Sequence, residues 1–216
     1  MTFKLQPILA HIKTLYQKPI SVDRFQEYLG MLQGNTKGDL ALPISGFNPM
    51  AKDHILQKIE ELELLDAEAI VEEAIVEVNR NLPSSVVGSA KEIIVVINIA
   101  DDLKGSWTNY YTTDFDSKFK LNAFVNRGFC VPYFWTSESY SKQLIHNRTT
   151  EYMARTHYRF NNPQPITLED HFLQEVFVAK MINDKDLKVD HDDLADIETF
   201  YPVSYTHLTL PTICSV

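Results

Sequence analysis

The residues best suited to chemistry are four aspartates that follow the most apolar run of the chain, residues 92–100. Asp101 and Asp102 come directly after this run, and Asp114 and Asp116 follow a segment rich in Tyr and Thr. Carboxylate oxygens are the ligands that hard divalent cations prefer. If the four carboxylates converge, the pattern predicts a site for Mg²⁺ or a similar cation. The alternative is that these aspartates form turns and are solvated.

The conformation of residues 101–116 decides whether the carboxylates can converge. If residues 93–100 and 107–114 pair as a hairpin, the two pairs of acids lie about 23 Å apart along the strands and cannot share one ion. If residues 101–116 instead form a loop over the end of the first strand, all four acids can meet. The sequence leaves both alternatives open.

Aromatic and basic residues elsewhere could bind a polar or anionic substrate. Trp107 and Asn109 offer a stacking face and hydrogen-bonding groups, which are common in sites for polar ligands. One side of a predicted helix carries groups suited to a carboxylate or phosphate, namely Arg148, Tyr152, Arg155 and Arg159. The alternatives are that the aromatic residues belong to the core and that the arginines form internal salt bridges, such as Arg155 with Glu151.

His171 and Glu175 lie one turn apart on a predicted helix that is apolar on nearly every side. A carboxylate on a helix of this kind needs a partner, because an unpaired buried charge is costly. The two residues could act as an acid–base couple, contribute to a metal site, or bind the arginines. The alternative is a structural bridge from Glu175 to a histidine or an arginine.

The elements that must position these residues are mostly helices. Apolar spacing predicts amphipathic helices over residues 3–17, 22–32, 49–65, 67–81, 137–160 and 167–182. Apolar or β-branched runs predict strands over residues 93–99, 107–115, 119–125 and 129–135. Because no helix is expected between these strands, the sheet should be mostly antiparallel. The fold class is therefore α+β, with a helical N-terminal part followed by a small sheet packed with two or three long helices.

The composition changes at Pro83-Ser84-Ser85, from acidic and helical to aromatic and β-branched. We therefore expect a helical subdomain over residues 1–82 and an α+β subdomain over residues 83–202. Residues 203–212, VSYTHLTLPT, resemble the reading-frame translation of a transposase adapter used in sequencing libraries. On this resemblance, residues 203–216 are a non-native tail and the native sequence after about Pro202 is unknown. The alternative is a natural apolar tail.

The net charge of −9 disfavours nucleic acid as a partner, because an acidic surface repels phosphates. No apolar run reaches the roughly 18 residues needed to cross a membrane, and the N-terminus lacks the apolar segment of a signal peptide. The default expectation is therefore a soluble cytoplasmic protein. Phosphate-binding glycine motifs and the H-E-x-x-H metal motif are absent from the sequence.

These observations support two functions of different classes. The first is an enzyme or binding protein for a small anionic or polar ligand, such as a metal-assisted hydrolase. Its catalytic groups would be His171, Glu175, Asp114 and Asp116, and a divalent cation would be its cofactor. The second is a non-catalytic structural or interaction domain whose helices and sheet are held by buried ion pairs. The first predicts that the charged groups converge on one pocket, and the second predicts that each is already paired.

Overall fold

A small parallel β-sheet lies at the centre of the computed structural model, which describes residues 1–34, 39–50, 53–82, 91–103 and 107–182. β1 (Thr2–Leu5), β2 (Glu92–Val95) and β4 (Phe129–Cys130) pair in the order β1-β2-β4, and β3 (Asn98–Ala100) pairs with β5 (Tyr133–Trp135). Hydrogen bonds of 3.0 Å from Val96 N to Cys130 O and from Asn98 N to Pro132 O join the two sets. β3 therefore continues β2, and β5 continues β4.

The prediction of a mostly antiparallel sheet is wrong, because every strand pair in the described residues is parallel. The segments expected to be further strands form two helices, α5 (Tyr110–Phe119) and α6 (Asn122–Arg127). Asn109 caps α5 by accepting a hydrogen bond from Thr112 N, and Gly128 ends α6 with a φ of 82°. These local signals outweigh the β-propensity of Thr and Tyr. The two helices form a crossover connection, which is what parallel neighbours require.

The other helices in the described residues are α1 (Leu9–Gln17), α2 (Val22–Gln33), α3 (Asp53–Leu64), α4 (Ala67–Asn81), α7 (Lys142–Asn161) and α8 (Leu168–Ile182). The predicted helix over residues 3–17 is β1 followed by α1, because Pro7 holds the preceding residue in an extended conformation. The predicted helix over 137–160 begins at Lys142, where the Ser141 hydroxyl accepts a hydrogen bond from Leu144 N. At the start of α8, the Thr167 hydroxyl accepts a hydrogen bond from Asp170 N at 3.2 Å, and Asp170 Oδ2 accepts one from Thr167 N at 2.9 Å.

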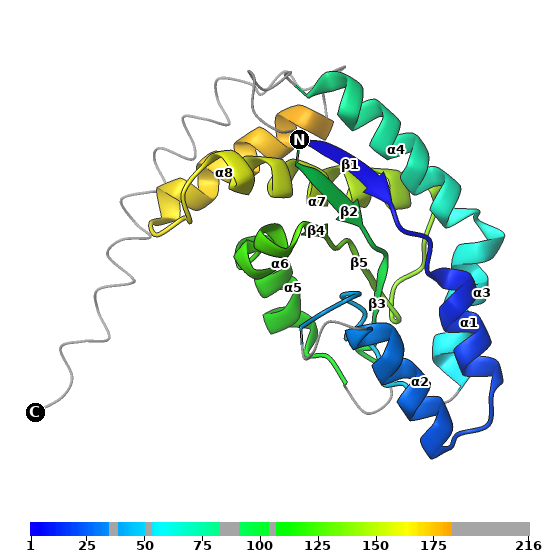
Figure 1. The fold of residues 1–216 in the computed structure, drawn as a ribbon. Helices are drawn as coiled ribbons and strands as arrows, with labels where there is room; N and C mark the ends of the chain where they lie inside the picture. Colours follow the sequence, from blue (N-terminus) through cyan, green and yellow to red (C-terminus); the bar gives the residue numbers. More distant parts are fainter. Residues whose placement is uncertain (35–38, 51–52, 83–90, 104–106, 183–216) are drawn as a thin grey trace, which may run out of the picture. The chain divides into compact units, whose positions relative to one another are not determined.

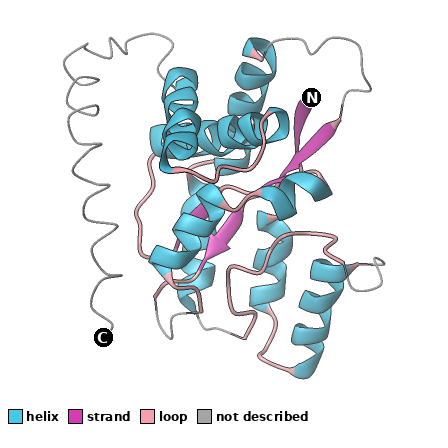
Figure 2. Ribbon diagram, turned by 90° about the vertical axis from the view of Figure 1, so that its left-hand side faces the viewer, coloured by secondary structure: helices cyan, strands magenta, loops and turns pink. Residues whose placement is uncertain are grey.

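The core joins the sheet to the helices that surround it. α4 packs against β1 and α7, and α7 packs against β4 and α8 (Figure 1). The strands lie among these helices (Figure 2). Phe134, Trp135 and Tyr152 are among the largest fully buried side chains. Burial of each large apolar side chain contributes about 1.5–3 kcal/mol to stability, so this core fixes the strand ends.

The outer edge of β1 is closed by a side chain rather than by another strand. The Asn79 carboxamide, from α4, accepts a hydrogen bond from Phe3 N at 2.8 Å and donates one to Phe3 O at 2.9 Å. Phe3 therefore makes on its outer side the two hydrogen bonds that a neighbouring strand would supply. Unpaired strand edges invite pairing with other chains, and this interaction closes one such edge.

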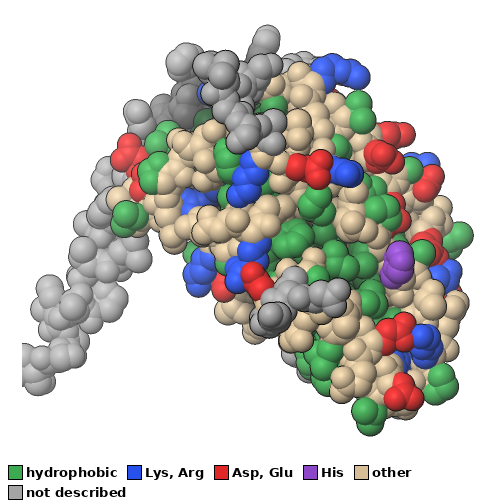
Figure 3. Space-filling model, in the orientation of Figure 1, with side chains coloured by type: hydrophobic (Ala, Val, Ile, Leu, Met, Phe, Trp, Pro, Cys, Tyr) green, Lys and Arg blue, Asp and Glu red, His purple; other side chains and the backbone are tan. Residues whose placement is uncertain are grey.

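Residues Met1–Ile182 form one compact unit, in which β1 pairs with β2. The division into subdomains at residue 83 stays a prediction, and the predicted non-native tail lies outside the described residues. Acidic and basic side chains are interspersed on the face seen in Figure 3. Among the helices that the structure describes, none has the length and apolar character needed to cross a bilayer.

Candidate functional site

The candidate site lies where β3 and β5 end side by side. Asp101 and Asp102 follow β3, and Thr136 and Ser137 follow β5. The described part of the segment after β3 is a loop that folds back, because Thr108 donates from its N and from its hydroxyl to Asp101 O, at 2.9 and 2.8 Å. The hairpin alternative is therefore excluded. Ligands of open α/β sheets bind outside the carboxyl ends of the strands, so this edge is the natural place for a site.

Asp101 contacts His54, which α3 brings to the end of the sheet. Asp101 Oδ1 lies 2.9 Å from His54 Nε2, and the two side chains are 1% and 8% exposed. His54 Nδ1 is also buried and has no hydrogen-bond partner in the described structure. When the imidazole is neutral and Nε2 donates to Asp101, Nδ1 carries a lone pair that can accept a hydrogen bond or a proton. The arrangement is that of a histidine oriented by a carboxylate.

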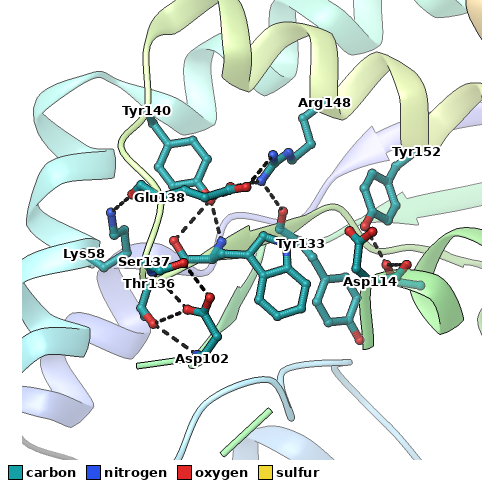
Figure 4. A network of polar contacts seen from close by, with 12 residues as sticks. Lys58, Asp102, Asp114, Tyr133, Thr136, Ser137, Glu138, Tyr140, Arg148 and Tyr152 are labelled. Atoms are coloured by element: carbon teal, nitrogen blue, oxygen red, sulfur yellow. Dashed lines mark hydrogen bonds and ion pairs between the residues drawn. The ribbon is translucent and has the colours of Figure 1, made fainter. Parts of the chain in front are cut away.

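Asp102 ties the two strand ends together. Its N donates to Thr136 Oγ1 at 3.2 Å, and its Oδ1 accepts a hydrogen bond from Ser137 N at 3.0 Å. The Ser137 hydroxyl donates to Asp102 Oδ2 (Figure 4). The Thr136 hydroxyl lies 3.0 Å from Asp102 Oδ1 and 3.3 Å from Asp101 Oδ1, and its one proton can go to either carboxylate. The two aspartates thus share a hydroxyl at an edge where Ser137 is exposed.

Arg148 belongs to a network beside this edge (Figure 4). Its guanidinium binds both carboxylate oxygens of Glu138 and donates to Tyr133 O at 3.2 Å. The Tyr140 hydroxyl contacts the N and the O of Trp135. Tyr133 and Trp135 are alternate residues of β5, so these side chains close its outer edge as Asn79 closes that of β1. Although burial opposes the charge on Arg148, its hydrogen bond and charge contact with Glu138 raise its pKa.

Lys58 joins the same network from α3. Its Nζ donates to a carboxylate oxygen of Glu61 and to Glu138 O, and the other oxygen of Glu61 accepts a hydrogen bond from Tyr140 N at 2.9 Å. Burial also raises the pKa of the Tyr140 hydroxyl above its ordinary range. The basic groups nearest to this edge are therefore engaged by carboxylates, and Tyr140 stays neutral at physiological pH.

Arg155 and Glu175, predicted as substrate-binding and catalytic residues, bind each other. Arg155 Nε and Nη2 donate to the two carboxylate oxygens of Glu175, at 2.9 and 2.6 Å, and Arg155 is 5% exposed. Burial by itself would raise the pKa of Glu175, but the hydrogen bonds and charge of Arg155 lower it. Gln174 donates to Lys118 O at 3.1 Å, which attaches this part of α8 to α5. The pair is the structural bridge that the sequence offered as an alternative.

Asp114 and Asp116 each bind a lysine one turn further along α5. Asp114 lies 2.8 Å from Lys118 Nζ, and Asp116 lies 2.7 Å from Lys120 Nζ. Tyr152 reaches the same helix, where its hydroxyl lies 2.7 Å from Ser117 Oγ. The structure thus brings Tyr152 and Asp114 close together (Figure 4). It places Asp114 and Asp116 on a helix, apart from the strand end that carries Asp101 and Asp102.

The remaining predicted residues have separate environments. Arg159 donates to Pro163 O at 3.0 Å and to Asn122 Oδ1. His171 does not bind Glu175, and its ring stands edge-on to that of Phe119 with centroids 5.0 Å apart. Trp107 is 49% exposed, with its Nε1 donating to Ser45 O at 3.1 Å, and Asn109 caps α5.

In the described residues, no group of three or more His, Cys, Asp or Glu side chains is arranged to hold a metal ion.

Asp101 and Asp102 stand out in the sequence, but their partners do not. His54 stands on the predicted helix over 49–65 with nothing in the local pattern to indicate a contact 47 residues away. Thr136 and Ser137 look like helix caps, yet their hydroxyls bind Asp102. An open depression of about 450 Å³, lined in part by Glu61 and Tyr140, lies next to the network.

Comparison with protein-family models, curated proteins and solved structures gave no significant match.

Proposed function

We propose that the protein binds a small hydroxylated ligand at the carboxyl end of β3 and β5. The observation that carries this proposal is His54, whose Nε2 contacts Asp101 while its buried Nδ1 has no partner in the described structure. A buried nitrogen without a hydrogen bond costs about 1–3 kcal/mol, which a donor from a ligand would offset. Asp101 orients the ring, so Nδ1 is also placed to accept a proton as a general base.

The groups at this edge favour a neutral hydroxylated ligand over an anion. His54 Nδ1 and the Asp102 carboxylate accept hydrogen bonds, and the exposed Ser137 hydroxyl can donate or accept. Lys58 and Arg148, which would attract an anion, already bind Glu61 and Glu138. A sugar or another polyol supplies donors for these acceptors. The exposed ring of Trp107, on the loop after β3, supports a ligand with an apolar face.

The test is a titration of the whole protein with ribose, glucose and inositol, followed by the NMR signals of the His54 imidazole. We expect at least one polyol to shift these signals in a saturable way, and sodium phosphate and acetate to leave them unchanged. Because Nδ1 is covered by protein atoms, the ligand must displace side chains to reach it, so signals of Asp102 and Ser137 should shift too. Asp101→Asn should abolish the saturable shift, and His11→Gln, at an exposed histidine of α1, should not. Polyols that leave His54 unperturbed would contradict the proposal.

A second candidate function, a non-catalytic domain held by buried ion pairs, is supported by the pairs Arg148–Glu138 and Arg155–Glu175. A substrate anion could reach these arginines only by replacing a carboxylate that already binds them. Under this function, truncation of Glu175 should lower stability. If Glu175 were instead a catalytic residue of an enzyme, as the sequence predicts, its truncation should leave a stable protein that no longer binds its ligand. The free energy of unfolding of Glu175→Ala decides between the two.

A further inference from the structure

The outward side of α8 is apolar. Leu168, Leu173 and Val176 are 40, 52 and 39% exposed, whereas Gln174 and Val178 are buried on the opposite side. α8 lies along α7 (Figure 1), held by the ion pair between Arg155 and Glu175. A helix that is apolar on both sides is usually covered on both, and contiguous exposed apolar side chains mark interaction sites.

Two charged residues mark the ends of this apolar side. Glu169 and Lys180 are both exposed. At 100° per residue, they point in directions about 20° apart on the helix and stand roughly 16 Å apart along it. Neither forms an ion pair within the part of the chain that the structure describes. The outward side of α8 therefore has an acid at its start, a base at its end, and Leu173 and Val176 between them.

We infer that α8 pairs antiparallel with α8 of a second copy of this chain. A two-fold axis beside residues 174–175 places Leu173 against Val176 of the second copy and Glu169 against Lys180 of the second copy. The same axis repeats each contact, so the surface is complementary to itself. The charge order of α8 selects the antiparallel arrangement, because a parallel pair would place like charges together. This interface is distinct from the strand-end site, and neither depends on the other.

The test begins with sedimentation velocity of the full chain from about 1 to about 100 µM, the range suited to an interface of one helix pair. We expect a dimer that forms as concentration rises. Lys180→Glu and Glu169→Lys each place like charges at both ends of the interface, and each should weaken the dimer about tenfold. High salt should lessen this difference between the variants and the wild type.

A mixture of the two charge variants gives the decisive result. In the mixed dimer, the lysine introduced in one chain would face the glutamate introduced in the other, and the unchanged Lys180 would face the unchanged Glu169. Opposite charges would therefore meet at both ends, and we expect the mixture to dimerise more tightly than either variant alone. Leu173→Asp should abolish the dimer, and Leu64→Asp, at an 88% exposed leucine of α3, should not. A wild-type chain that stays monomeric at every concentration, or a mixture no tighter than its components, would overturn the inference.

Discussion

Asn79 binds the peptide group of Phe3 as a neighbouring strand would, with hydrogen bonds of 2.8 and 2.9 Å to its N and O. On the other side of the sheet, Arg148 donates to Tyr133 O, and the Tyr140 hydroxyl contacts both N and O of Trp135. Polar side chains from α4, from α7 and from the segment before α7 thus close the two outer edges of a sheet only three strands wide. The sequence predicts Arg148 as a substrate-binding residue, and in the structure its guanidinium binds Tyr133 O and Glu138.

Replacement of Asn79 should show how much its hydrogen bonds to Phe3 contribute to the stability of the protein. Asn79→Ala leaves Phe3 N and O without partners in a partly buried place, so we expect a loss of about 1–3 kcal/mol in the free energy of unfolding. Urea denaturation followed by circular dichroism measures it. Asn81→Ala, at an exposed position of the same helix, is the matched control and should change stability by less than about 0.5 kcal/mol. Equal effects of the two changes would show that the contact with Phe3 contributes nothing.

Gly46 should tolerate no side chain. A Cβ there would lie 2.6 Å from Ile99 O and 2.7 Å from Asn98 Oδ1, at the strand end beside the candidate site. Gly46→Ala should therefore destabilise the protein and disturb the NMR signals of His54. Gly30→Ala is the control, because the added methyl group meets nothing within 4 Å and α2 should gain up to about 1 kcal/mol. A Gly46→Ala protein as stable as the wild type would mean that this loop lies elsewhere.

The Arg155–Glu175 pair should be a strong determinant of stability. Arg155→Met leaves Glu175 in a partly buried site without its partner. Breaking a fully buried pair costs about 3–5 kcal/mol in the free energy of unfolding. Because Glu175 retains some exposure, we expect a loss below this range. The double variant Arg155→Met, Glu175→Leu removes both charges and should recover much of that loss. Thermal and urea unfolding of the three proteins measures the coupling. If the double variant is no more stable than the single one, the charge left behind is not the cause.

The same pair predicts a dependence of stability on pH. Arg155 holds the pKa of Glu175 below its ordinary value of 4.5. Because this pKa is lowered in the folded state, the stability contributed by ionised Glu175 is fully present well above pH 4.5. That stability is lost as the pH falls through the folded-state pKa of Glu175. Between about pH 7 and about pH 3, the wild type should lose more stability than Arg155→Met. Parallel pH profiles of the two proteins would contradict this assignment.

The sequence predicts best where one local signal dominates. The strand over residues 93–99 is β-branched and apolar, and it forms β2 and β3. Pro132 lies between β4 and β5 on the edge of the sheet, where proline is tolerated in a strand region. Residues 107–115 are the opposite case, because Thr and Tyr favour a strand while the Asn109 cap favours a helix. Because residues 107–115 and 119–125 are helices rather than the expected strands, they form a crossover, and the sheet is parallel rather than antiparallel.

Pairs made by tertiary contact are harder to predict than single residues. The sequence indicates that Glu175 needs a partner, and in the structure Arg155 binds it. The sequence also singles out Asp101, but only the fold brings His54 beside it. On an extended chain, Asp114 and Asp116 would point to the same side. On a helix the same spacing points the two apart, and each finds a lysine one turn away.

Cys130 should resist modification while the protein is folded. Burial raises the pKa of its thiol to about 12, although a hydrogen bond with Thr156 acts in the opposite direction. The thiolate is the reactive form, so at about pH 8 only about one molecule in ten thousand carries it. In a Cys214→Ser chain, we expect a thiol reagent to label Cys130 only as fast as the protein unfolds. Labelling at the rate of an unstructured cysteine peptide would show that the thiol is accessible.

The contact between Asn79 and Phe3 also bears on how the chain is made. Among the described elements β1 is translated first, yet its partner in the sheet, Ile93 opposite Phe3, is translated much later. α4 emerges before β2, so Asn79 is available to Phe3 while the sheet is still incomplete. Once it is bound, β1 presents only one edge to the chain that follows. With Asn79 bound first, β2 would meet a strand that can accept it on one side only.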